Sequence, residues 1–456
     1  MIGSESSARP GRGTLAKLRE WRNDASHTSI AQKVAGGAFL IRVFSAALVF
    51  ASQVLFARWM GSFEFGIYVY VFAWVLVIGE FADLGLSPAA QRFIPEYANA
   101  KSLALLRGFI CHGRWLTVAA ATLIGAVCAG LVKLAEPLLA SYVVLPLMIA
   151  CVSLPFYALL QIQDGIARSY NWVQVALMPL YVIRHVVMLA MVGLAYVLGL
   201  GTDAVTVTAF LSLSMALTAI GQTIVLNRRL ARTIETGPRA TDTRNWFTVA
   251  FPMLMVGGFY LLLTHTDIIV LQQFRGPDDV AMYYAASKTV ALVSFVYFAV
   301  SAAVAHRFTE YHVTGERERL AEFLADSIKW TFWPSAAATT GILLFGKPLL
   351  SLFGPAFVAG FPTMVILAVG LLARAAVGPV ERLLTNLGQQ RACAAVYGFA
   401  FLLNLVLCIV LIPPFGIEGA AIATTLALVA ESVVLVYVTR TRLGLHAFIW
   451  RRSPAP

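Results

Sequence analysis

Four basic side chains interrupt long apolar stretches of this 456-residue sequence: Arg42, Arg184, Lys288 and Arg374. A charge near the middle of a bilayer costs about 2.5–3.5 kcal/mol even on the lenient scale, so such side chains avoid lipid. Arginine forks match the oxygens of a phosphate group, and lysine supplies a compact point charge. The sequence therefore predicts that these four cations bind an anionic group inside the membrane. The alternative for each is an ion pair between helices.

Two acids in the apolar stretches, Asp267 and Glu431, are candidates for binding a proton or a sodium ion. The alternative for each is an ion pair or a helix contact, and this is the favoured interpretation. His265 lies close to Asp267 in the sequence, but a lone histidine in a helix is more often packed or hydrogen-bonded than reactive. Deep cations outnumber deep acids, which favours an anionic ligand over a cationic one.

Almost the whole chain consists of apolar stretches that could position these charges inside a bilayer. Hydrophobic residues make up 59% of the sequence and charged residues 12%, about half the charge of a typical soluble protein. The hydrocarbon core needs about 20 apolar residues per helix. The twelve stretches of suitable length lie at residues 34–57, 66–86, 111–132, 138–161, 177–199, 204–225, 247–273, 280–305, 330–353, 360–384, 391–413 and 417–438. The sequence predicts an all-α polytopic membrane protein with about twelve transmembrane helices.

Lysine and arginine alternate between the connections that join these stretches. The two termini and the even-numbered connections hold 25 of the 34 basic residues, whereas the odd-numbered connections hold four. Positive charge collects in cytoplasmic loops, so both termini are predicted to be cytoplasmic. The same bias places basic residues beside anionic lipid. It therefore explains the net charge of +11, and no nucleic-acid partner is needed to account for it.

Landmarks that recur about 215 residues apart indicate a duplicated chain. Arg92 follows Tyr68 by 24 residues in the first half, and Arg307 follows Tyr283 by 24 residues in the second. Six helices per repeat make the repeats parallel, so we expect two pseudo-symmetric six-helix lobes around a central cavity. The predicted parts are a cytoplasmic basic segment, an N-lobe, a cytoplasmic linker, a C-lobe and a basic cytoplasmic tail, at residues 1–33, 34–225, 226–246, 247–438 and 439–456, respectively.

The sequence lacks the motifs of several other chemistries. Its five cysteines lie in or beside apolar stretches, and there is no CxxC or Cys/His cluster, which argues against a disulfide framework and a metal site. The connections contain no Walker loop or catalytic triad, and those on the external side are short. We therefore expect neither an enzyme nor a cofactor.

Several motifs carry a resemblance to a known family. They are ARWMG (57–61), EFGIY (64–68), DLGL (83–86), RFIPEY (92–97), DIIVL (267–271), YYAASK (283–288) and FGIEGAAIAT (415–424). With them the chain resembles the bacterial polysaccharide-biosynthesis flippases, which move lipid-linked oligosaccharides. These belong to the multidrug/oligosaccharidyl-lipid/polysaccharide exporter superfamily. The resemblance runs from about residue 34 to residue 440.

The resemblance implies a flippase that works by alternating access in the bacterial cytoplasmic (inner) membrane. Its substrate would be an undecaprenyl-pyrophosphate-linked oligosaccharide for exopolysaccharide, capsule or O-antigen (lipopolysaccharide) biosynthesis, and the pyrophosphate is the group that the four cations are expected to bind. A polysaccharide polymerase and export machinery are the implied partners, and coupling to a proton or sodium gradient stays open. The alternative from another class is a membrane-embedded polysaccharide polymerase or ligase. Alternatives within the superfamily are a peptidoglycan-precursor flippase and a multidrug/cation antiporter. The antiporter is disfavoured because the first apolar stretch carries Arg42 and no acid.

Overall fold

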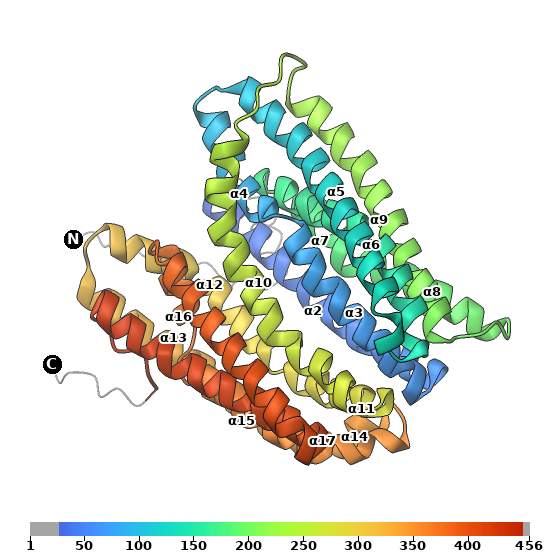
Figure 1. Ribbon diagram of the computed structural model, residues 1–456. Coiled ribbons are helices and arrows are strands. Elements are labelled where there is room, and N and C mark those ends of the chain that lie inside the picture. Colours follow the sequence, from blue (N-terminus) through green and yellow to red (C-terminus); the bar gives the residue numbers. More distant parts are fainter. Residues whose placement is uncertain (1–26, 450–456) are drawn as a thin grey trace, which may run out of the picture.

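The computed structural model describes the backbone of residues 27–449, and every regular element in that range is helical (Figure 1). Residues 1–26 and 450–456 lie outside the described part, and so do most of the predicted N-terminal segment and the end of the tail. The helices of the first half are α2 (His27–Met60), α3 (Ser62–Ala82), α4 (Leu86–Asn99), α5 (Leu103–Leu134), α6 (Ser141–Ser169), α7 (Val173–Met178), α8 (Arg184–Val197) and α9 (Ala204–Thr233). Those of the second half are α10 (Thr243–Phe274), α11 (Pro277–Ala291), α12 (Ser294–Val313), α13 (Arg317–Leu344), α14 (Gly346–Ser351), α15 (Phe361–Ala375), α16 (Val380–Asn386) and α17 (Gln390–Leu443).

Nine helical segments of the described part are long and apolar enough to cross a membrane, with α3 and α4 counted as one and α7 and α8 as another, or ten if the bent pair of α11 and α12 counts as one span. α17 contains 54 residues and breaks at Gly416, whose φ of 60° and ψ of −132° are not helical. An unbroken helix of this length would extend about 80 Å, more than twice the hydrocarbon core, so α17 supplies two spans. α13, with 28 residues, is long enough for another. With these helices, the described part of this multi-pass membrane protein has room for the twelve spans that the sequence predicts.

The helices form two lobes, which are drawn in blue to green and in yellow to red in Figure 1. The N-lobe comprises α2 to α9, and the C-lobe comprises α10 to α17. Equivalent landmarks have equivalent surroundings in the two lobes. α3 begins after Gly61 and α11 after Gly276, and the tyrosine seven residues further on, Tyr68 or Tyr283, is buried in each case. The duplicated spacing therefore corresponds to a duplicated helical context.

The lobes contact each other closely where α3 begins. A Cβ atom added at Gly66 would lie 1.9 Å from the carbonyl oxygen of Pro277, so only glycine allows this approach of α3 to α11. Next to it the Ser62 hydroxyl donates a hydrogen bond to the Asp278 carboxylate. Arg58 donates to two carbonyl oxygens of the C-lobe, one of them at 3.1 Å. We call these contacts the seal, and its residues are Arg58, Ser62, Gly66, Pro277, Asp278, Ser351 and Leu352.

The start of α10 is anchored to the N-lobe, although most of the helix belongs to the C-lobe. The ring of Trp246 is buried and meets the ring of Phe109 edge-on at 5.1 Å. Its indole N–H donates to the Tyr97 hydroxyl at 3.0 Å. Arg107 on α5 donates to two carbonyls of the connection at 2.8 and 3.3 Å. The connection between the lobes, residues 234–242, is therefore held against the N-lobe.

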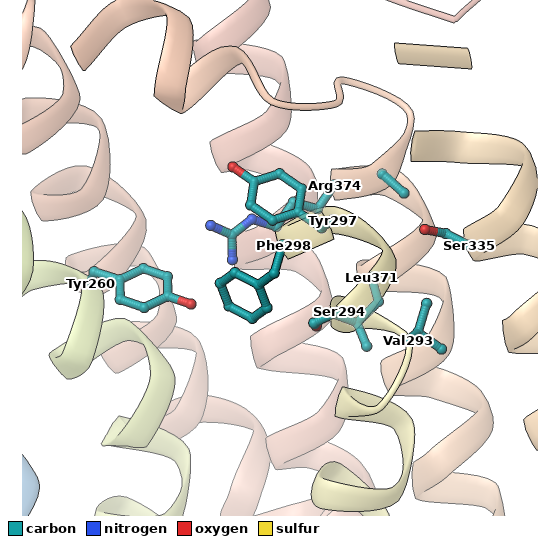
Figure 2. A pocket seen from close by; sticks show the side chains of 9 residues that line it. Tyr260, Val293, Ser294, Tyr297, Phe298, Ser335, Leu371 and Arg374 are labelled. Carbon is teal, nitrogen blue, oxygen red and sulfur yellow. The ribbon is translucent and has the colours of Figure 1, made fainter. Parts of the chain in front are cut away.

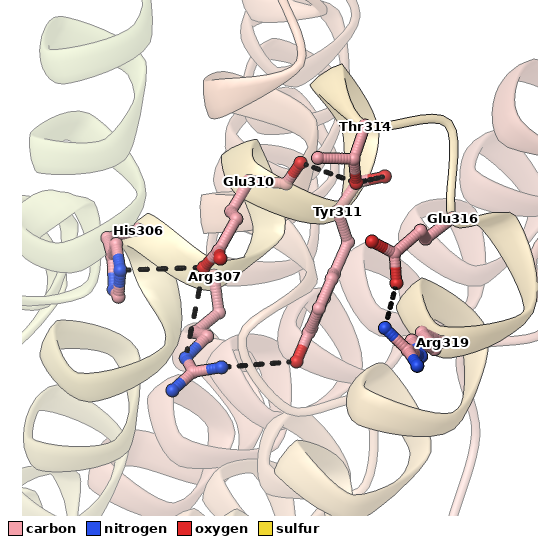
Figure 3. A network of polar contacts seen from close by, with 7 residues as sticks. All are labelled: His306, Arg307, Glu310, Tyr311, Thr314, Glu316 and Arg319. Atoms are coloured by element: carbon pink, nitrogen blue, oxygen red, sulfur yellow. Dashed lines mark hydrogen bonds and ion pairs between the residues drawn. The ribbon is translucent and has the colours of Figure 1, made fainter.

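Charged side chains gather at the opposite end of the lobes from the seal. Figure 3 shows an example at the turn between α12 and α13, where Arg307 lies 3.3 Å from the Tyr311 hydroxyl and 4.0 Å from Glu310. Arg319 and Glu316 form a second ion pair at 2.5 Å. Each exposed pair contributes at most about 1 kcal/mol. We call this the basic end, defined by the connections α4–α5, α9–α10 and α12–α13 and by the end of α17.

Candidate functional site

Arg184 is the most deeply buried of the four predicted cations. α8 begins at this residue, directly after the π-helical turn Pro179–Ile183, a type of turn that is frequent at functional sites. The side chain is 6% exposed; its Nη2 lies 3.1 Å from Nε2 of His185, and its guanidinium lies 5.7 Å from the ring centre of Phe72. Nε and Nη1 are buried without a hydrogen-bond partner in the described part of the chain. A buried unpaired charge is costly, so these two donors are available to an anionic ligand.

Two tyrosines connect Arg184 to two further predicted cations. The Arg42 guanidinium lies 5.4 Å from the ring centre of Tyr181, and Lys288 Nζ lies 5.1 Å from that of Tyr284. Both tyrosines also lie near Arg184 and contribute to its electrostatic environment. We call these five residues the cationic row. The row crosses between the lobes, because Tyr284 and Lys288 belong to α11 and the other three belong to the N-lobe.

Arg42 has an acidic neighbour that the sequence analysis did not single out. Asp164 on α6 forms an ion pair with Arg168 at 2.8 Å, and it also interacts electrostatically with Arg42. The predicted fourth span ends at residue 161, whereas α6 continues to Ser169. Asp164 was therefore not counted among the deep acids. Its carboxylate is shared between two arginines, so it offsets only part of the positive charge at this end of the row.

The fourth predicted cation, Arg374, is neutralised within the C-lobe. Its Nε lies 3.5 Å from the fully buried carboxylate of Glu431. Figure 2 shows Tyr260 and Tyr297 beside Arg374. Its guanidinium lies 5.3 and 5.5 Å from their ring centres, and 3.4 Å from the Tyr397 hydroxyl. The cavity beside Arg374 measures about 40 Å³, which is room for only a few water molecules. The structure thus joins two residues that the sequence predicts for separate roles.

Asp267 lies at a meeting point of three helices of the C-lobe. Its Oδ2 accepts hydrogen bonds from the Tyr283 hydroxyl of α11 at 2.5 Å and the Thr424 hydroxyl of α17 at 3.2 Å. Its Oδ1 accepts from the backbone N–H of Ile268 at 2.8 Å. The side chain is buried, and it interacts electrostatically with Lys288 of the cationic row. Three hydrogen bonds thus hold the Asp267 carboxylate in place, and its interaction with Lys288 connects it to the cationic row.

The tyrosines are the site residues that the sequence analysis missed. Tyr181, Tyr284, Tyr260 and Tyr297 lie within apolar stretches and give no signal in a search for charge. A usable signal exists in their spacing. Tyr181 precedes Arg184 by three residues and Tyr284 precedes Lys288 by four, and residues at these separations share a helix face. The described residues contain no group of three or more His, Cys, Asp or Glu side chains that could hold a metal ion.

Solved structures of membrane transporters share this fold. The chain matches an inward-facing structure of a multidrug resistance MATE family transporter with a TM-score of 0.69 and 14% identity, over 89% of this chain and 94% of that one. It matches the lipid II flippase MurJ in an inward closed conformation with a TM-score of 0.69 and 18% identity, over 88% of this chain and 87% of that one. At these identities the likeness establishes the arrangement of helices in two lobes.

Two curated archaeal proteins match part of the sequence. A probable low-salt glycan biosynthesis flippase, Agl15 of Haloferax volcanii, is 25% identical over 180 residues, which are 39% of this chain and 38% of that protein. The uncharacterized membrane protein MJ1068 of Methanocaldococcus jannaschii is 27% identical over 187 residues, 40% of this chain and 36% of that protein. The matched segments thus span less than half the length of these relatives.

Family profiles cover most of the helical region. The profile described as MatE matches residues 252–410, which lie within the C-lobe. The profile described as polysaccharide biosynthesis protein matches residues 35–312, which include the N-lobe, the connection between the lobes and the first helices of the C-lobe. Since this second profile matches more than half of its length, the chain belongs to the polysaccharide biosynthesis protein family.

Proposed function

We propose that this chain is a flippase that carries a polyprenyl-pyrophosphate-linked oligosaccharide across the cytoplasmic membrane by alternating access. The observation that carries the proposal is the cationic row, in which charges from both lobes meet and two donors of Arg184 lack a partner among the described residues. Every lipid carrier of this class presents a pyrophosphate, whatever sugar it bears. Membership of the family and the partial match to a glycan flippase support this substrate class.

The chemistry of the row suits a pyrophosphate. Arg42 and Arg184 offer planar forks for its oxygens, and Lys288 offers a third charge from the other lobe. The three cations of the row outnumber the two acids that interact with them, Asp164 beside Arg42 and Asp267 beside Lys288, and Asp164 is shared with Arg168. The row therefore keeps a net positive charge. The sugar would contact aromatic side chains such as those of Tyr181 and Tyr284, while the polyprenyl tail would stay in lipid.

The seal supports the alternating-access part of the proposal. Its hydrogen bonds cross from one lobe to the other at the end opposite the basic end. The charge distribution predicts that the basic end and both termini face the cytoplasm, so the seal would lie on the external side. In this arrangement the substrate would load from the cytoplasm, and the seal would break when the lobes open outward.

We assign the acids of the C-lobe to coupling. A proton or sodium ion at Asp267 would weaken the electrostatic interaction of that carboxylate with Lys288. A proton on Glu431 would release Arg374 from its ion pair and make it a fourth ligand for the pyrophosphate. Ion binding and substrate binding would then involve the same cations, which is the linkage that coupled transport needs.

The chain would act as a transporter in a biosynthetic pathway and not as an enzyme. We place it in the bacterial inner membrane, where it supplies a polysaccharide polymerase and export machinery with lipid-linked units of an exopolysaccharide, a capsule or O-antigen. The likeness to the lipid II flippase favours a second candidate, a peptidoglycan-precursor flippase. The row recognises pyrophosphate in either case, so complementation of strains that lack one or the other flippase distinguishes the two.

The proposal is tested with the purified full chain in proteoliposomes that contain a fluorescent undecaprenyl-pyrophosphate-linked oligosaccharide. A membrane-impermeant glycosidase added outside cleaves only the sugar in the outer leaflet. With the protein present, the cleaved fraction should rise with time from about half towards completion. Protein-free vesicles and vesicles with an Arg184→Gln variant should stay near half. Equal time courses for the parental protein and protein-free vesicles would refute flipping of this substrate.

A further inference from the structure

A cavity of about 620 Å³ opens at the basic end and is lined by both lobes. Arg92 contributes from α4 of the N-lobe, whereas Arg391 and Arg442 contribute from the two ends of α17 in the C-lobe. The start of α10 forms a further wall with Val249, Pro252 and Met253. No acidic residue lines the cavity. It is separate from the cationic row, because the two sets share no residue.

The three arginines give the cavity a concentrated positive charge. Arg92 is partly offset by Glu96, which lies 3.7 Å away on the exposed face of α4. Arg391 and Arg442 form no ion pair within the part of the chain that the structure describes, although they lie 51 positions apart in the sequence and are brought together by the fold. Like charges held around one cavity repel one another. A bound anion would relieve this repulsion.

The remaining walls indicate what kind of anion fits. Residues 388–392, which lead into the first turn of α17, line the cavity, so the positive end of that helix dipole adds to the arginine charge. Val249, Pro252 and Met253 offer an apolar wall directly beside these polar groups. An inorganic ion would leave that wall in water. A phosphate on an amphipathic molecule would use both the basic and the apolar parts of the cavity.

We propose that this cavity is a binding site for a lipid-borne phosphate group, distinct from the cationic row. Arg391 and Arg442 hold the phosphate, Arg92 reaches it from the other lobe, and the α10 wall receives the first methylenes of the lipid. Because Arg92 and the two other arginines belong to different lobes, an occupied site ties the lobes together at the basic end. Binding therefore favours the arrangement of lobes in which the three arginines line one cavity.

The test measures binding to the purified full chain in detergent and does not involve glycan transport. The probes are dihexanoyl phosphatidic acid, dihexanoyl phosphatidylcholine and inorganic pyrophosphate, each titrated by isothermal calorimetry. The double variant Arg391→Gln/Arg442→Gln should raise the Kd for phosphatidic acid at least ten-fold. The matched control Arg228→Gln/Arg440→Gln removes two exposed charges that lie outside the cavity, and it should leave the Kd within two-fold of the parental value.

The three probes identify the source of the phosphate. Tighter binding of phosphatidic acid than of pyrophosphate, lost in the double variant, supports a lipid ligand. Pyrophosphate that binds as tightly, with the same loss, supports the phosphate site but overturns the lipid source. Equal losses in the double variant and its control, or equal affinity for phosphatidylcholine, overturn the site. If the double variant does not accumulate, each single variant should raise the Kd about three-fold. Flipping can fail while this binding persists, so the two proposals are tested separately.

Discussion

Arg374 and Glu431 form an ion pair whose Nε–Oε1 distance is 3.5 Å, with the carboxylate fully buried and the guanidinium enclosed by tyrosine rings. The two residues lie on α15 and on the second half of α17. Each side chain compensates the charge of the other, as a charge inside the membrane requires. The pair therefore holds together two spans of the C-lobe, and neither residue is free in this arrangement of the lobes.

Removing one member of this pair should destabilise the protein more than removing both. Arg374→Met leaves Glu431 buried and uncompensated, which costs about 3–5 kcal/mol. The double variant Arg374→Met/Glu431→Leu replaces the pair by apolar side chains and should recover most of that loss. Thermal unfolding of the purified variants in detergent measures the difference. A double variant that is less stable than either single variant would contradict this account.

Asp267→Asn should abolish the dependence of transport on an ion gradient while the protein still accumulates. The amide keeps the shape of the carboxylate but loses the charge that Tyr283 and Thr424 surround. Uptake or flipping is measured with and without a proton or sodium gradient. Tyr283→Phe is the matched control, since it removes one hydrogen bond and keeps the carboxylate, and it should stay gradient-dependent. Transport by the Asn variant that still follows the gradient would make Asp267 a structural residue.

The seal should be lockable by a disulfide. Ser62 and Asp278 are hydrogen-bonded across the lobes, so Ser62→Cys/Asp278→Cys places two thiols near each other. Oxidation should stop transport, and reduction should restore it, because the lobes can no longer separate at this end. The parental protein has five cysteines, all free in the structure, and the same oxidant should leave it active. Full activity of the oxidised pair, with the cross-link shown by mass spectrometry, would contradict a moving seal.

The orientation of the chain should be the one that the charge pattern predicts. Reporter fusions after residue 240, in the connection between the lobes, and at the C-terminus should both report the cytoplasm. The physical reason is that 25 of the 34 basic residues lie in the termini and even-numbered connections. A fusion in the connection at residues 200–203, between α8 and α9, should report the outside and serves as the control. An external signal from either of the first two would overturn the topology.

The sequence could predict most of the fold because apolar length and charge bias are local properties. The twelve predicted spans follow from the length of the apolar stretches, and the long helix α17 breaks at Gly416, between the last two of these stretches. Contacts between distant spans are a different matter. Nothing in the sequence tells that Arg374 meets Glu431 or that Asp164 lies beside Arg42, because these contacts depend on how the helices pack. Charge identified the candidates, and the structure decided which of them meet.

The cationic row yields the sharpest prediction about the substrate. Arg184 is buried with two unpartnered donors, and Arg42 is linked to it through Tyr181. Arg184→Gln and Arg42→Ala should each reduce polymer export at least ten-fold and trap lipid-linked oligosaccharide on the cytoplasmic side. Arg184→Lys should recover export only in part, because lysine keeps the charge but loses the fork that matches phosphate oxygens.

The control for these variants is Arg382→Gln. Arg382 is half exposed and lies 3.9 Å from Glu381 outside the row, so its loss should leave export close to the parental rate. Membrane abundance is measured in parallel by immunoblot, and the Arg184 comparison is made at equal abundance. A loss of export that follows abundance alone would show that the arginines only stabilise the fold. If Arg184→Gln inserts normally and exports at the parental rate, the row does not bind the pyrophosphate, because transport would then not need the two buried donors of Arg184.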